Sequence, residues 1–168
     1  MKILIIQCFD KPGGQSDRSY LFADKLQKLG HEITYLTNQY NHLDNSIEDK
    51  FTAKINRNIK YIFINNKKVR KSKLLSVLMN AISIIKIKKK FDVIISPSVP
   101  LINSLTGLVL AKLTRAKFFF EIRDVWPDAL VYNEIISKFN PIYLILKFLE
   151  LIIYKLCDGV ISALPNTK

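Results

Sequence analysis

The feature that most constrains the fold is an alternation between short apolar runs and stretches with helical periodicity. The run at residues 2–8 is almost wholly apolar, as expected for a strand that is buried on both faces. Residues 17–29 instead carry apolar side chains at helical spacing, and Gly30 follows as a stop signal. This alternation predicts a doubly wound α/β fold, with a mostly parallel sheet and helices on both of its faces.

The same alternation continues along the whole sequence. Strands are predicted at residues 2–8, 32–37, 60–64, 92–96, 116–122 and 159–163, and helices at residues 17–29, 72–87, 101–114 and 141–156. No internal repeat and no linker interrupts the pattern, and 168 residues suit one domain with a sizeable core. We therefore expect residues 1–168 to form a single Rossmann-like domain.

Composition excludes several classes of protein. A hydrophobic fraction of 49% argues against disorder, and five Gly and six Pro argue against a collagen-like chain. Two cysteines inside apolar runs favour a reducing, cytoplasmic compartment. The apolar start is too short for a signal peptide, and no run of 18 residues is apolar enough to span a bilayer. A soluble or peripheral protein is expected.

The net charge of +12 comes from one segment. Residues 51–91 contain twelve Lys and Arg and no Asp or Glu, whereas the rest of the sequence is neutral. Because this segment includes the apolar helix predicted at residues 72–87, we expect it to dock on an anionic membrane surface. The alternative is a solvated run of charge. The predicted membrane contacts are Lys67, Lys68, Arg70, Lys71, Lys73, Lys88, Lys89 and Lys90.

Two further interpretations concern partners. The predicted helix at residues 141–156 is apolar on most faces, which favours burial in the core or in a domain interface over contact with lipid. A pI of about 9.7 would also suit nucleic-acid binding. The basic residues are not interleaved with aromatic stacking residues, however, and no nucleic-acid-binding motif is present, so nucleic acid is not an expected partner.

Polar residues gather where predicted strands end, which is where open parallel sheets bind ligands. The strand at residues 116–122 runs into four charged residues and the only Trp of the chain, and this concentration of charge favours a site. The structural alternative is an ion pair of Arg123 with Glu121 or Asp124. After the first strand, Gly13 and Gly14 would let backbone N–H groups approach an anion, or would form no more than a turn.

Several motifs occur together in a recognisable order. The sequence resembles the N-terminal domain of the retaining GT-B glycosyltransferases of family 4, and among them the bacterial enzymes that build capsular and O-antigen polysaccharide. The resemblance rests on Pro12-Gly13-Gly14, Leu29-Gly30-His31-Glu32, Ser96-Pro97-Ser98-Val99-Pro100, the E-x-R-D-x-W-P-D segment at residues 121–128, and the closing helix and strand at residues 150–161.

The resemblance implies a Rossmann-like half of a GT-B fold that holds a lipid-linked or saccharide acceptor at the inner face of the cell membrane. Gly13 and Gly14 would face the phosphates and sugar of a nucleotide-sugar donor. Asp124 would orient an acceptor hydroxyl, and Arg123 would meet a phosphate or a developing negative charge. The implied acceptor-binding residues are Ser98, Glu121, Trp126 and Asp128. No metal or other cofactor is expected, because the nucleotide-sugar is a co-substrate.

The C-terminal donor-binding domain of that family is absent from these 168 residues. Its E-x7-E carboxylate pair is missing, since no two of the five glutamates are eight positions apart. We expect the chain to be inactive alone, because half a cleft cannot orient a donor. It would be a fragment, a truncated gene product or one subunit of a split enzyme with a partner chain. The alternative function is a non-catalytic adaptor that docks on the membrane.

Overall fold

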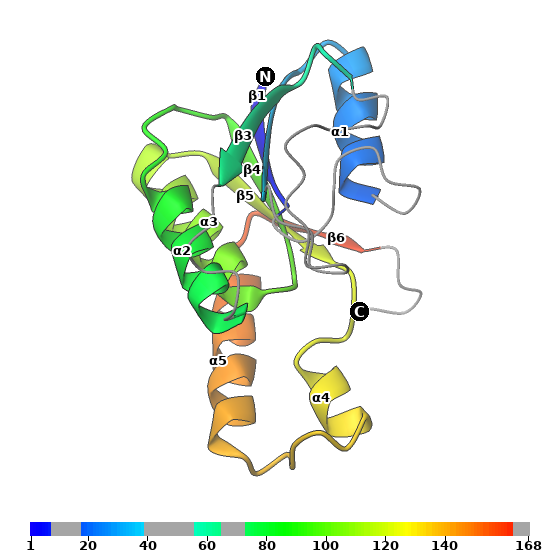
Figure 1. Ribbon diagram of the computed structural model, residues 1–168, viewed down its shortest axis with the longest axis vertical. Coiled ribbons are helices and arrows are strands. Elements are labelled where there is room, and N and C mark those ends of the chain that lie inside the picture. The colour runs from blue at the N-terminus through cyan, green and yellow to red at the C-terminus, as the bar shows by residue number, and fades with distance from the viewer. Residues whose placement is uncertain (8–17, 39–55, 65–72, 163–168) are drawn as a thin grey trace.

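The computed structural model is a six-stranded parallel sheet with helices on both faces (Figure 1). It describes residues 1–7, 18–38, 56–64 and 73–162. The strands are β1 (Lys2–Ile6), β2 (Glu32–Asn38), β3 (Lys60–Ile64), β4 (Val93–Pro97), β5 (Lys117–Ile122) and β6 (Gly159–Ser162). The helices are α1 (Arg18–Lys28), α2 (Lys73–Ile85), α3 (Leu101–Thr114), α4 (Asp128–Tyr132) and α5 (Pro141–Leu156). The predicted doubly wound α/β class is confirmed.

The strand order is β3-β2-β1-β4-β5-β6, with every neighbouring pair parallel. Chain order reverses between β1 and β4, which is the topological switch point of such sheets. Because all the strands run the same way, their carboxyl ends lie along one edge of the sheet. The register there places Pro97 of β4 beside Glu121 of β5.

Alternation of side chains along the apolar strands builds two cores. Ile3 and Ile5 of β1 pack in one cluster with Tyr20 and Ala23 of α1. The intervening Leu4 and Ile6 belong to the larger cluster on the opposite face, which also contains buried residues of α2, α3 and α5. Because these strands are buried on both faces, apolar and polar residues do not alternate along them.

Helix α3 is the central helix of the larger core, because it contacts both α2 and α5. It also lies unusually close to the sheet at Gly107. A Cβ atom at this position would come within 2.8 Å of Ile6 Cδ1 and 3.2 Å of Phe118 Cε2. A larger residue here would therefore force the side chains of Ile6 and Phe118 to shift, so glycine is favoured by the short distance between α3 and the sheet.

Two features differ from the sequence expectations. Helix α4 was not predicted, because five residues are too few to show a helical period. For α5 the sequence favoured burial in the core or in a domain interface. Only Glu150 and Ile153 of this helix are buried, so core burial is wrong for most of it, and a domain interface stays a prediction. Among the described residues, no helix has both the length and the hydropathy needed to span a membrane.

Candidate functional site

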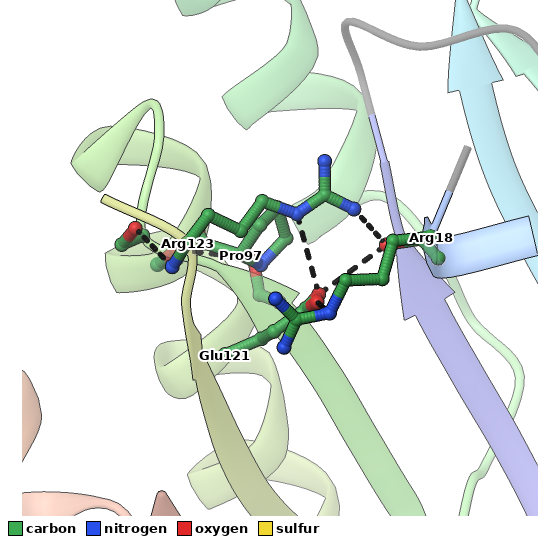
Figure 2. A network of polar contacts seen from close by, with 8 residues as sticks. Arg18, Pro97, Glu121 and Arg123 are labelled. Atoms are coloured by element: carbon green, nitrogen blue, oxygen red, sulfur yellow. Dashed lines mark hydrogen bonds and ion pairs between the residues drawn. The ribbon is translucent and has the colours of Figure 1, made fainter. Parts of the chain in front are cut away.

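A buried carboxylate at the end of β5 binds two arginine side chains (Figure 2). Glu121 Oε1 lies 3.2 Å from Arg18 Nε, and Glu121 Oε2 lies 3.6 Å from Arg123 Nε. The Glu121 side chain is only 7% exposed. Burial makes an unpaired carboxylate costly, so the two guanidinium groups are what allow Glu121 to occupy this position as an anion.

The ends of β4 and β5 fix the backbone of this site. Ser98 N–H donates to the Glu121 carbonyl at 2.7 Å, and this bond continues the β4–β5 pairing past Pro97. The buried Ser98 Oγ then accepts from the Arg123 N–H at 3.2 Å. Ser98, Glu121 and Arg123, three of the predicted site residues, are thus brought together by the parallel sheet.

Helix α1 contributes two residues that sequence reasoning missed, Arg18 and Ser19. The buried Ser19 hydroxyl donates to Glu121 Oε2 at 3.3 Å and accepts a hydrogen bond from Arg123 Nη2. Arg18 lies in the first turn of α1, where the helix dipole disfavours a cation. In the sequence, a basic residue at this unfavourable helix position is the feature that could have indicated a role for Arg18. Its ion pair with Glu121 explains why a cation is tolerated there.

The arginine network by itself carries more positive than negative charge. Two arginines share one carboxylate in the network of Arg18, Ser19, Glu121 and Arg123, which leaves a surplus of one positive charge. The side chains of Arg18 and Arg123 are 41% and 19% exposed, so solvent and ligands can reach both. Guanidinium groups suit phosphate oxygens, because their N–H groups form a planar fork.

Asp124 follows Arg123 directly and is exposed. Within the described part of the chain its carboxylate has no hydrogen bond or ion pair. An exposed carboxylate beside a cationic site can accept a proton or a hydrogen bond from a bound hydroxyl. The position of Asp124 is compatible with the role that the resemblance implies.

Asp128 contacts α5, and among the described residues no hydrogen bond or ion pair joins it to the arginine network. Its carboxylate accepts from Tyr143 Oη at 2.7 Å and from Lys147 Nζ at 2.8 Å, and Lys147 also pairs with Glu150 at 2.7 Å. Burial alone would raise the pKa of Asp128, but these two hydrogen bonds lower it below the ordinary value. Asp128 therefore anchors α4 to α5, and its predicted contact with an acceptor stays a prediction.

The remaining predicted residues fall into three groups. Trp126 is half-buried and packs against the larger core. Lys88, Lys89 and Lys90 are exposed after α2, which contains Lys73. Outside the described residues lie Gly13, Gly14, Lys67, Lys68, Arg70 and Lys71.

The described residues contain no group of three His, Cys, Asp or Glu side chains placed to bind a metal, and the expectation of a metal-free reaction stays a prediction.

No protein-family model and no curated protein sequence matches the chain. Among solved structures, the chain is similar to the crystal structure of Acinetobacter baumannii MurG, with 16% sequence identity and a TM-score of 0.56. The similarity covers 100% of this chain and 43% of the MurG chain, so the chain spans less than half of that protein's length. The six-stranded parallel sheet and its helices thus have the fold of one half of a GT-B protein, as in MurG.

Proposed function

We propose that the chain is the acceptor-side half of a GT-B glycosyltransferase of surface polysaccharide biosynthesis. It acts with a donor-binding half to transfer a sugar from a nucleotide-sugar to a lipid-linked or saccharide acceptor at the inner face of the cell membrane. The observation that carries the proposal is the arginine network at the carboxyl edge of a sheet with the GT-B half fold. The sequence resemblance to family 4 supports the polysaccharide class.

The network suits the binding of a phosphate or diphosphate group. Glu121 and Ser19 hold the guanidinium of Arg123 before a ligand arrives, so less side-chain entropy is lost on binding. Arg18 and Arg123 together would neutralise a phosphate of the acceptor or of the donor. Such a group next to Asp124 would place an acceptor hydroxyl within reach of the exposed carboxylate.

The test uses membranes from source cells that carry the unaltered gene, a deletion, or single variants. Labelled UDP- and GDP-sugars are supplied, and transfer into the lipid fraction is measured. We expect Asp124→Asn to lower kcat by about a hundredfold or more, because the group that accepts the hydroxyl proton is lost. Arg123→Gln should chiefly raise KM. A chelator should leave transfer unchanged, since no metal is expected.

The control is Glu32→Gln, which alters an exposed ion pair with Lys60 near the opposite, amino end of the sheet. Transfer at the unaltered rate in the deletion strain would refute the proposal. If the deletion abolishes transfer but Asp124→Asn and Arg123→Gln both support the normal rate, the chain is a non-catalytic adaptor and the catalytic assignment is wrong.

A further inference from the structure

Helix α4 is joined to α5 by polar contacts. Among the described residues of α4, Asp128–Tyr132, none is buried, and Figure 1 shows this helix apart from the sheet, at the end of the segment that leaves β5. Asp128, its first residue, accepts hydrogen bonds from Tyr143 Oη at 2.7 Å and from Lys147 Nζ at 2.8 Å. Because no core residue fixes α4, these two bonds take part in setting where the helix lies.

The lysine that reaches α4 is itself held by a buried carboxylate. Lys147 Nζ lies 2.7 Å from Glu150 Oε2, and the Glu150 side chain is buried. The rest of α5 is apolar apart from its tyrosines and Lys155. Replacing a buried ion pair by apolar residues often costs no stability, so stability alone is a poor reason for this pair. The lysine network is defined here by Asp128, Tyr143, Lys147 and Glu150.

A short hydrogen-bonded segment joins the lysine network to Asp124. The Ala129 N–H donates to the Val125 carbonyl at 2.7 Å, so helical hydrogen bonding extends back from α4 to Val125. Asp124 is the residue directly before Val125. Trp126, inside the same turn, packs against the larger core. A displacement of α4 would therefore be passed on to the backbone that carries the Asp124 carboxylate.

The arginines of the site are held by other elements. The Arg123 side chain contacts Glu121 of β5 and Ser19 of α1. Its backbone N–H donates to the Oγ of Ser98, which follows β4, and Arg18 belongs to α1. The lysine network instead joins α4 to α5. The two cations and the exposed carboxylate of the candidate site thus have separate supports.

We propose that Lys147 is a positioning residue for Asp124. By holding Asp128, it fixes the segment at 125–128 so that the Asp124 carboxylate meets an acceptor hydroxyl in a productive geometry. A displacement of about 1 Å at such a group can cost about a hundredfold in rate. The inference rests on the proposed function, which is what gives Asp124 a reaction. Its specific consequence is a loss of kcat with little change in KM, because the arginines keep their own support.

The test variant is Lys147→Met with Glu150→Leu, which removes both charges together and leaves neither of them unpaired. In the membrane transfer assay its kcat should fall about tenfold or more. Its KM for the nucleotide-sugar should stay within about twofold of the unaltered value. Lys147→Arg keeps a cation between the two carboxylates and should retain kcat. The matched control is Lys155→Met, which removes an exposed lysine of the same helix and should change neither constant.

A double-mutant cycle asks whether Lys147 acts through Asp124. In a chain that already carries Asp124→Asn, the paired variant should cause no further loss of kcat, because the group that it positions is gone. A second loss of about tenfold in that background would overturn the proposal. So would a paired variant that keeps the normal kcat while Asp124→Asn is impaired, or one that raises KM at an unchanged kcat.

Trp126, the only tryptophan of the chain, gives a readout that needs no transfer. In the purified chain, acrylamide quenching of its fluorescence should rise in the paired variant, as the ring becomes more exposed. Quenching should not change in Lys155→Met, and circular dichroism checks that both variants are folded. If the paired variant does not fold, Tyr143→Phe replaces it with the same directions of change. Unchanged quenching would overturn the proposal.

The two readouts separate this inference from the proposed function. If the deletion strain transfers sugar at the unaltered rate, the proposed function is refuted and Asp124 has no reaction to be positioned for. If transfer depends on the gene and on Asp124, but the paired variant changes neither kcat nor quenching, only the role of Lys147 is wrong.

Discussion

At the residue scale, the candidate site depends on one carboxylate that holds two guanidinium groups. Glu121 is buried, whereas Arg18 and Arg123 retain access to solvent. The carboxylate therefore has a structural role, because it holds both arginine side chains in place. The two arginines are the groups that can contact a ligand. Substitutions of Glu121 and of the arginines should accordingly differ in their effects on stability and on binding.

Glu121→Gln should lower the free energy of unfolding by about 2–3 kcal/mol. Breaking a buried ion pair costs more than this, but Arg18 is partly exposed and can regain water. The comparison is Glu32→Gln, which breaks an exposed pair with Lys60 and should cost less than about 1 kcal/mol. Urea unfolding of both variants measures the difference. Equal costs would show that Glu121 does not hold the network together.

Asp128 should make stability depend on acid pH. Its pKa in the folded chain is below the ordinary 3.8, because its hydrogen bonds to Lys147 and Tyr143 outweigh burial. The carboxylate therefore stabilises the fold above pH 3.8, and this contribution is lost as the pH falls through the folded pKa. Asp128→Asn should cost about 1 kcal/mol near neutral pH and progressively less below pH 4. A cost that is independent of pH would contradict this account.

At the element scale, periodicity predicted all six strands and the four longer helices, since each carries at least four residues of regular pattern. Periodicity did not predict which other elements of the fold would cover each face of a helix. The residues of α5 such as Phe148 read as interior, yet only one side of that helix meets the core. Arg18 and Ser19 were missed for a related reason, because their contact with Glu121 joins segments about a hundred positions apart.

The packing of α3 gives a test at this scale. Gly107→Ala should destabilise the fold by about 1–3 kcal/mol, because the added Cβ would meet Ile6 and Phe118. Helix propensity alone predicts the opposite sign, a gain of about 1 kcal/mol. Val109→Ala, at an exposed position of the same helix, should change stability by less than about 0.5 kcal/mol. Thermal unfolding of the two variants decides between packing and propensity.

At the scale of the whole molecule, the strand order should determine how stability is distributed. β1 and β4 each have a paired strand on both sides, whereas β3 and β6 lie at the edges of the sheet. Backbone amides of β1 and β4 should exchange with solvent at least about a hundredfold more slowly than those of β6. Hydrogen exchange followed by NMR measures this directly. If the backbone amides of β6 exchanged as slowly as those of β1, the β6 edge of the sheet would have to be covered.

The same strand order has a consequence for the growing chain on the ribosome. Ile3 pairs with Ile33 on one side and with Val93 on the other, so one neighbour of β1 is made early and the other much later. Until β4 emerges, β1 presents an open parallel edge flanked by apolar side chains, a form that invites aggregation. The longer the ribosome takes to translate the segment between β2 and β4, the longer this edge of the nascent protein stays open.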